Sequence, residues 1–157
     1  LYHQVWNRVR DETYIQSYTN RLKQLMVLTK ESGIDPVLIT QPAVYGYAVD
    51  DVTGTDLSKI VIEGANGEIG EGLSGKEKWE LLELYNNVTR KVARQEGILL
   101  IDLAQKMPKS TKYYYDYIHF TNDGAVLVAD IIYSDLCPYL EKKHPGHVKK
   151  PCGEKDL

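Results

Sequence analysis

An aspartate and a histidine give this sequence its clearest chemical signal. Asp116 precedes His119 by three positions, directly ahead of an apolar stretch. Histidine moves protons near neutral pH, and it does so best when a carboxylate accepts its other ring N–H and fixes its tautomer. A single turn of chain can bring two side chains at this spacing together. The spacing predicts a general base with its orienting carboxylate, although capping or a polar surface turn explains the same two residues.

Three helices and two short strands are predicted to position these residues. Apolar residues recur at helical spacing over 13–32, 76–95 and 122–136, whereas 37–40 and 98–102 are short, mainly apolar runs. Gly33 and Gly97 follow the first two helices as C-terminal stops, and Thr121 or Asn122 can cap the third. The helix over 122–136 is apolar nearly all round, so we expect it to pack deeply.

This alternation of helices and strands predicts an α/β fold, in which a parallel sheet lies between helices on both faces in a three-layer α/β/α arrangement. Strands that are apolar on both faces suit such a sheet. Ligands bind beyond the carboxyl ends of parallel strands. Asp102 ends the second strand, and Asp116 and His119 lie in the loop region that follows. The sequence therefore predicts a site at the carboxyl edge of the sheet.

Two strands are too few for an independent sheet, because stable sheets usually contain three or more. We therefore expect the sheet to be incomplete in this chain, with its amino-terminal strands supplied from upstream of Leu1 or by a partner chain. On this interpretation residues 1–140 form the carboxyl part of an α/β domain, and residues 141–157 form a polar tail. An unpaired edge strand would be open to pairing with another chain.

The segment 43–76 interrupts the regular pattern. It holds seven of the twelve glycines, and only 59–62 is strand-like. A loop of this length is usually a lid or a binding loop, although a tolerated surface insertion is the alternative. Tyr45 and Tyr47 are the candidate residues of this segment for lining a substrate pocket.

The composition limits the classes of partner. A length of 157 residues with 43% hydrophobic content suits one globular domain. A net charge of −3 gives no electrostatic reason to expect a nucleic-acid or membrane-surface partner. No apolar run approaches the ~20 residues of a membrane span. We expect a small-molecule substrate and no cofactor.

The two cysteines suggest a link near the carboxyl end. Cys137 and Cys152 flank His144 and His147, so a disulfide, a zinc site and free thiols are all open. The spacing matches no common zinc finger, which argues against a metal. A disulfide would stabilise the tail by ~3 kcal/mol through loop closure. It would also favour an extracytoplasmic location, secreted or periplasmic.

Three segments resemble a known family. They are 37–42, 98–102 and, most specifically, the pattern Asp116-x-x-His119-Phe120-Thr121-x-x-Gly124 ahead of an apolar helix. Together they resemble the second half of SGNH (GDSL-type) hydrolases, which are esterases and lipases built on a flavodoxin-like three-layer sheet. The resemblance covers most of residues 13–140.

This resemblance implies a serine-type hydrolase that acts on carboxylic esters, with a small acyl ester, on a carbohydrate or a lipid, as the expected substrate. His119 would be the general base that activates a serine and later protonates the leaving group. Asp116 would orient and stabilise His119.

The family's other catalytic groups are missing from the sequence. Its nucleophile lies in a Gly-Asp-Ser block near the amino end of the domain, and its oxyanion hole adds a Gly and an Asn from two further blocks. None of these blocks occurs here, and none of the six serines is in a strand-to-helix turn, Ser74 being the least implausible. We therefore expect the nucleophile to come from elsewhere. The alternative is a non-catalytic binding or assembly module that keeps the fold without the nucleophile.

Overall fold

Helices and strands alternate along the chain, as the sequence predicts. The computed structural model describes residues 11–62, 72–147 and 151–153. The elements in chain order are α2 (Glu12–Glu31), β1 (Val37–Ile39), β2 (Val61–Ile62), β3 (Leu73–Ser74), α3 (Gly75–Glu96), β4 (Leu99–Ile101), α4 (Leu103–Lys106), α5 (Asn122–Lys143) and the short 3-10 helix η1 (Pro145–His147).

Local side-chain signals fix the helix ends. Ser74 and Glu77 form a reciprocal capping box at the start of α3, and Gly97 ends this helix with a left-handed φ of 62°. Asp11 caps α2 by accepting a hydrogen bond from the Thr13 N–H. Thr121 caps α5, which selects one of the two predicted capping residues.

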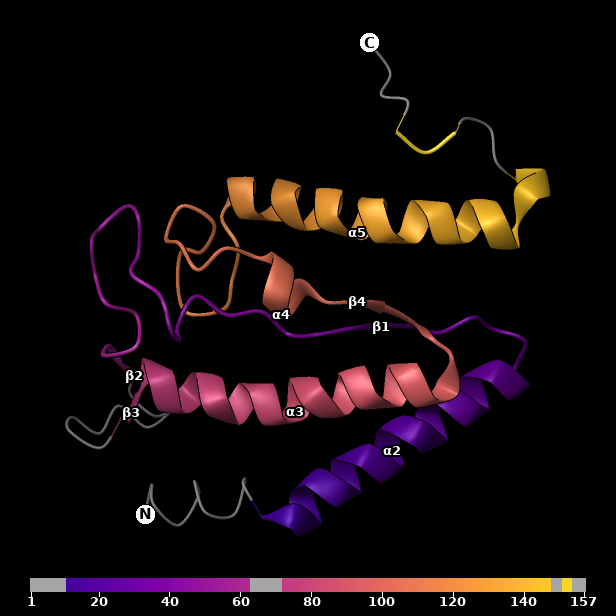
Figure 1. Cartoon of the computed structure of the whole chain (residues 1–157), viewed down its shortest axis with the longest axis horizontal. Helices are drawn as coiled ribbons and strands as arrows, with labels where there is room; N and C mark the ends of the chain where they lie inside the picture. Colours follow the sequence, from indigo (N-terminus) through magenta and orange to yellow (C-terminus); the bar gives the residue numbers. More distant parts are fainter. Residues whose placement is uncertain (1–10, 63–71, 148–150, 154–157) are drawn as a thin grey trace.

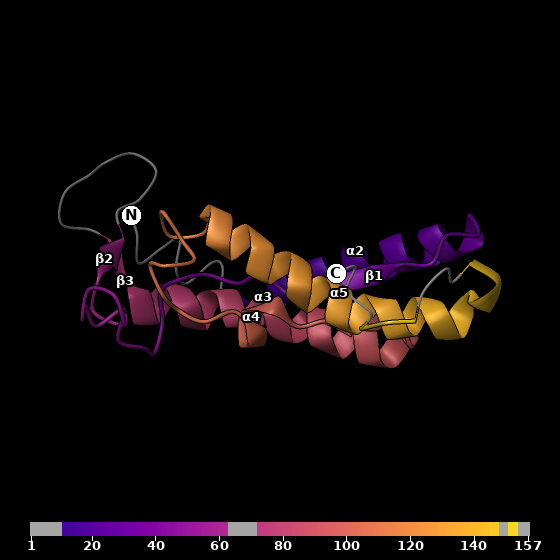
Figure 2. The same ribbon diagram turned by 90° about the horizontal axis from the view of Figure 1, so that it is seen from above.

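The central element is a two-stranded parallel sheet of β1 and β4, with Val37, Leu38 and Ile39 opposite Leu99, Leu100 and Ile101. On one face of the sheet α5 contacts β4, and on the other face α3 contacts both strands. The helix α2 packs against α3 (Figure 1). Viewed from above, α5 runs lengthwise over this arrangement (Figure 2). A small parallel sheet with helices on both faces agrees with the predicted α/β class.

Two clusters of apolar side chains hold these layers together. Successive side chains of a strand point to opposite faces, so Leu38 joins the α3 side and Ile101 the α5 side. The buried residues of the cluster around α2 and α3 are Met26, Leu38, Val88, Val92, Ala93 and Ile98. Those of the cluster beneath α5 are Val44, Leu57, Ile101, Leu103, Met107 and Tyr114. The second cluster combines residues from the loops that follow both strands, so it positions any site built on those loops.

The longest departure from the sequence-based prediction is α5, which continues to Lys143 instead of ending at 136. Gly124 is its only buried residue, and the structure describes every residue of this helix. Val126 and Tyr133 are 63% and 51% exposed. The prediction of deep packing is wrong, because one side of α5 packs on the core and no described element covers its other side. Neither α5 nor any other helix in the described part of the chain is long and apolar enough to cross a membrane.

The described part of the glycine-rich segment 43–76 contributes to the core. Ala43, Val44, Tyr45 and Leu57 are buried. The strand-like run at 59–62 supplies β2, which pairs in antiparallel fashion with β3. Residues 63–71 of this segment lie outside the described ranges. The rest packs beside the sheet and is held there by buried side chains.

The outer edge of β1 has no partner strand among the described residues. The Thr40 N–H donates to the Ile101 C=O at 3.2 Å. Backbone groups of neighbouring residues in a parallel strand point to opposite sides, so those of Ile39 point away from β4. The Ile39 side chain is 44% exposed. This edge therefore offers unpaired backbone groups beside exposed apolar surface.

Candidate active site

The structure brings Asp116 and His119, termed here the acid–base pair, together in one tight turn between α4 and α5. Asp116 Oδ1 accepts hydrogen bonds from the backbone N–H of Ile118 at 2.9 Å and of His119 at 2.7 Å. The other carboxylate oxygen, Oδ2, lies 2.6 Å from His119 Nδ1. One carboxylate therefore builds the turn and holds the imidazole at the same time.

The electrostatics of the pair suit proton transfer. Hydrogen bonds from the backbone N–H groups of His119 and Ile118, followed by the bond to the imidazole, lower the pKa of Asp116 to about 2. Asp116 is thus ionised at neutral pH and acts only as an acceptor. Nδ1 of His119 must then carry a proton, which leaves Nε2 of the neutral ring as the acceptor.

The acceptor nitrogen of His119 is available. The His119 side chain is 61% exposed, and its Nε2 makes no hydrogen bond to any residue in the described ranges. A base that meets a substrate hydroxyl must have a free nitrogen within reach of solvent or ligand. The turn therefore presents an oriented base that is open on one side.

Flanking contacts hold the turn in a hairpin-like closure. The Tyr115 N–H donates to the His119 C=O at 3.2 Å, and Tyr114 and Phe120 form an isolated antiparallel bridge. Tyr114 is 2% exposed, and its ring lies 5.2 Å from the Phe120 ring. The buried Tyr114 and the partly buried Phe120 therefore anchor a turn whose tip is exposed.

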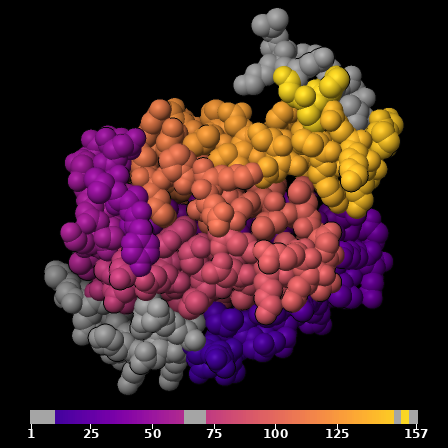
Figure 3. Space-filling model, in the orientation of Figure 1, coloured from indigo at the N-terminus to yellow at the C-terminus, as the bar shows by residue number. Residues whose placement is uncertain are grey.

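The turn lies at the end of the molecule to which β1 and β4 lead. The Val44 N–H, shortly after β1, donates to the Tyr117 C=O at 3.1 Å. The loops that follow the two strands gather at this end of the ribbon, and their surfaces adjoin in the space-filling view (Figures 1 and 3). The candidate site therefore lies on the side that the sequence predicts, beyond the carboxyl ends of the strands.

Asp50 ties the two loops together, and sequence reasoning missed it. This carboxylate is 0% exposed. It accepts hydrogen bonds from the backbone N–H and the hydroxyl of Thr53 at 3.1 and 2.5 Å, and from those of Thr111 at 2.9 and 2.8 Å. These hydrogen bonds outweigh the effect of burial and lower the pKa of Asp50. The Asp50-x-x-Thr53 spacing is a local signal for the first two bonds, but nothing local indicates Thr111.

Lys109 provides a second tie between the loops. Its amine donates to the backbone carbonyls of Ala43 at 2.9 Å and of Tyr45 at 2.6 Å, and lies 3.2 Å from the centre of the Trp79 ring. Burial lowers the pKa of Lys109 to about 7, against an opposing effect of Glu83. A neutral amine keeps two N–H donors, enough for both carbonyls. The support for the 43–45 segment therefore does not depend on the charge of this lysine.

Gly124 allows α5 to begin directly against the site loop. The Thr121 hydroxyl accepts from the Gly124 N–H at 3.1 Å and donates to the Lys112 C=O at 2.7 Å. A Cβ atom on Gly124 would lie 2.0 Å from the backbone oxygen of Tyr113. Only glycine permits this close approach of the helix to the loop.

The substitution Gly124→Ala is therefore expected to destabilise the chain by about 1–3 kcal/mol, because the helix or the loop must move to relieve the clash. Urea unfolding followed by circular dichroism measures this change. Gly146→Ala is the matched control, since a Cβ atom there has no neighbour within 4 Å. Equal stability of the two variants would contradict the close approach.

The two candidate pocket tyrosines lie in different environments. Tyr45 is 8% exposed and belongs to a buried cluster with Ala43 and Ile62. Tyr47 is 60% exposed, and its hydroxyl donates to Glu80 at 2.5 Å. Neither makes a hydrogen bond or a ring contact with the acid–base pair in the described part of the chain. Their predicted role as pocket liners stays a prediction.

Asp102 follows β4 at the carboxyl edge, where the sequence predicts it. It accepts from the Thr40 hydroxyl at 2.7 Å and from two nitrogens of Arg90 at 2.8 and 3.0 Å. Arg90 also reaches Glu83 at 2.9 Å. The hydrogen bonds from Arg90 and Thr40 lower the pKa of Asp102 against the effect of burial. Asp102 therefore fastens the ends of both strands to α3, and its oxygens are already engaged.

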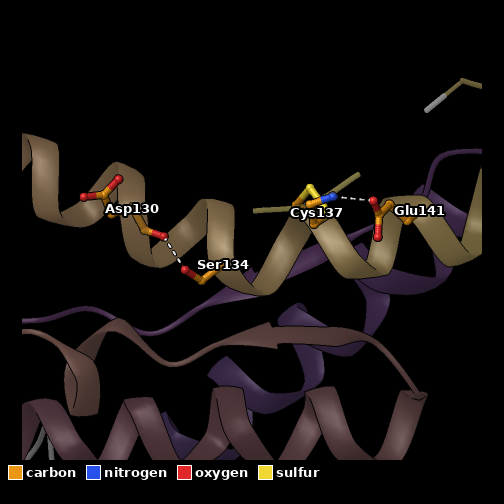
Figure 4. The surroundings of a disulfide bond; sticks show 5 residues. Asp130, Ser134, Cys137 and Glu141 are labelled. Carbon is orange, nitrogen blue, oxygen red and sulfur yellow. Dashed lines mark hydrogen bonds between the residues drawn. A yellow bond between two sulfur atoms is a disulfide. The ribbon is translucent and has the colours of Figure 1, made fainter. Parts of the chain in front are cut away.

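The cysteines form the expected disulfide. Cys137 in α5 and Cys152 in the tail are bonded, and the Cys152 N–H donates to Glu141 at 2.5 Å (Figure 4). Glu141 lies close to both sulfurs, but sulfurs in a disulfide are not the thiolates that zinc binds. His144 and His147 instead form an edge-to-face ring pair.

Reduction of the disulfide is expected to release the tail and leave the rest of the chain folded. Among residues 151–153, the hydrogen bond of the Cys152 N–H to Glu141 is the only one to the rest of the described chain. The disulfide stabilises the fold because it restricts the unfolded chain. Reduction therefore costs the full ~3 kcal/mol only if the tail stays ordered in the folded protein, and less if the tail is released. Limited proteolysis should cut the reduced tail, while helicity by circular dichroism stays near that of the oxidised protein. Cooperative loss of helicity on reduction would contradict this.

None of the six serines is hydrogen-bonded to the acid–base pair. All lie within the described ranges, and none makes a hydrogen bond to His119. Ser74 is occupied as the cap of α3, with its hydroxyl 2.7 Å from Glu77. Ser110 is 2% exposed. Among the described residues the arrangement therefore joins a carboxylate to an imidazole, without a serine hydroxyl hydrogen-bonded to that imidazole.

Comparisons with known proteins give no further assignment. No family model matches the sequence, and searches of curated proteins and of solved structures find no match.

Proposed function

We propose that this chain carries the acid–base part of a serine-type hydrolase that acts on carboxylic esters. One observation supports the proposal above all: the 2.6 Å contact between Asp116 Oδ2 and His119 Nδ1, with the carboxylate ionised and Nε2 exposed. This is the geometry in which a carboxylate fixes the tautomer of a general base. The resemblance of this stretch to SGNH hydrolases suggests the same role.

In the proposed reaction, His119 Nε2 takes the proton of a serine hydroxyl while the serine oxygen attacks the ester carbonyl. The imidazolium then gives this proton to the departing alcohol oxygen, which leaves an acyl-serine. In the second half a water molecule attacks the acyl group and gives a proton to His119, which passes it to the departing serine oxygen as the acid is released. Asp116 stays ionised throughout and stabilises the imidazolium.

The proposal places the nucleophile on a polypeptide segment outside these 157 residues, either in the same protein or in a partner chain. Three observations support this. None of the six serines of the chain makes a hydrogen bond to His119, the parallel sheet has two strands in the described part, and the outer edge of β1 is unpaired there. A segment that pairs with Ile39 and its neighbours would complete a flavodoxin-like three-layer domain and cover the exposed base.

The disulfide supports a related proposal about location. Disulfides persist mainly in oxidising compartments, and Cys137 is bonded to Cys152. We therefore propose an extracytoplasmic location for this protein.

A non-catalytic binding or assembly module is the second candidate. It is favoured by the six serines, none of which bonds to the base. It predicts that the acid–base pair persists without any associated hydrolysis.

Hydrolysis of a chromogenic acetyl ester separates the two candidates. The isolated 157-residue chain should show only background hydrolysis on either account. The complete gene product, together with any partner chain that completes its sheet, is called the complete protein below and should turn the ester over if it supplies a serine to His119. An inactive complete protein, together with no Gly-Asp-Ser block in its sequence, would support the module instead.

A further inference from the structure

The imidazole of His119 forms an offset stack with the aromatic ring of Tyr115. The Tyr115 ring lies 5.7 Å from the His119 ring, centre to centre, with 14° between the ring planes. The two residues also share a backbone hydrogen bond, from the Tyr115 N–H to the His119 C=O at 3.2 Å. The stack is thus fixed by the same closure that forms the turn.

This stack supplies a restraint that the carboxylate cannot. Asp116 holds the edge of the imidazole through Nδ1, but one hydrogen bond leaves the ring free to tilt about the axis of that bond. An offset stack of near-parallel rings restrains the plane of the imidazole, because tilting moves the ring away from the favoured stacked geometry. Together the two contacts determine the direction of Nε2.

Exposure makes this second restraint important. The His119 side chain is 61% exposed, and Tyr115 is 69% exposed. Buried catalytic groups are oriented by packing on all sides, whereas the described residues give this exposed imidazole one hydrogen bond and one ring stack. Tyr115 contributes little to the core, so the stack with His119 is the main contact of its ring that the structure describes.

We infer that Tyr115 is a positioning residue that holds the plane of the His119 imidazole so that Nε2 points toward the reacting hydroxyl. The inference rests on the proposed function, and it adds a residue that the Asp116 and His119 pattern does not contain. The aromatic face is the operative feature. Phenylalanine at position 115 should therefore hold the imidazole as tyrosine does. Leucine should not, because it keeps the apolar bulk but lacks the aromatic face.

A first experiment tests the stack without any activity. The ring protons of His119 are observed by NMR in the isolated 157-residue chain, in the wild type and in three variants. The wild type and Tyr115→Phe should show the upfield displacement that a covering aromatic ring produces, and Tyr115→Leu should lose it. Tyr133→Leu, at a 51% exposed tyrosine of α5, is the matched control and should keep it. Unchanged ring-proton shifts in Tyr115→Leu, or their loss in Tyr115→Phe, overturn the inference.

A second experiment measures the effect on catalysis in the complete protein. Loss of a stacked pair corresponds to a decrease of about 3- to 10-fold in kcat for Tyr115→Leu, with KM unchanged. Tyr115→Phe should restore kcat, which general destabilisation by the leucine variant would not explain. Equal kcat values for the leucine variant and the wild type overturn the positioning role. Failure of the proposed function is a separate result, because it appears as undiminished turnover in His119→Ala whatever the ring-proton shifts are.

Discussion

Replacement of His119 by alanine is expected to slow ester hydrolysis by the complete protein about 10³-fold or more, with little change in stability. The imidazole is the one group of the site with a free acceptor nitrogen beside an ionised carboxylate. Without it the serine hydroxyl keeps its proton, and the leaving alcohol receives none. Initial rates with a chromogenic acetyl ester measure the effect.

His144→Ala is the matched control for this variant. His144 is also exposed, but it lies at the end of α5 beside Asp35, with 3.6 Å between Nε2 and the carboxylate. It should retain wild-type turnover. Undiminished hydrolysis by His119→Ala, or an equal loss in both variants, would remove the basis for the assigned role.

Replacement of Asp50 by alanine is expected to lower the free energy of unfolding by about 3 kcal/mol or more. The carboxylate is fully buried and accepts four hydrogen bonds, which come from Thr53 and Thr111. Its removal breaks all four of these hydrogen bonds, and each hydrogen bond to a charged group contributes about 1.5–3 kcal/mol before non-additivity. The loop that carries the acid–base pair should loosen along with the 43–62 segment.

Urea unfolding of the 157-residue chain measures this loss. Asp51→Ala is the matched control, because Asp51 is the exposed neighbour of Asp50, and it should change stability by no more than about 0.5 kcal/mol. Similar midpoints for the two variants would show that the buried carboxylate does not tie the loops together.

The pH dependence provides an independent check on Asp50. Its pKa is lower in the folded chain than in the unfolded chain. The unfolded state therefore binds the proton first as the pH falls, so the stabilisation is complete above the unfolded pKa of about 3.9 and is lost below it. The difference in stability between the wild type and Asp50→Ala should accordingly shrink at acid pH.

Features encoded by neighbouring residues were predictable from the sequence. The helix ends follow from Ser74 and Gly97, and the parallel pairing follows from two short apolar runs between helices. The contact between Asp116 and His119 was predictable because three residues separate them in one turn. In each case the interacting groups are close in sequence, or a simple periodicity reports their burial.

Features that depend on distant residues were not predictable. Thr111 binds Asp50 across 61 positions, and no local pattern links the two. The exposure of α5 was missed because its apolar composition indicates which residues can be buried, whereas the width of the sheet decides how many are. The stack of Tyr115 on His119 was hidden in a run of three tyrosines, since only the folded turn distinguishes one ring from its neighbours.

Labelling with a serine-directed fluorophosphonate shows whether Asp116 and His119 activate a serine. We predict rapid labelling of a single serine in the complete protein, labelling slowed about 10³-fold in its His119→Ala variant, and no labelling of the isolated 157-residue chain. Equal labelling rates in the wild type and the histidine variant, or rapid labelling of one of the six serines in the isolated chain, would contradict the account.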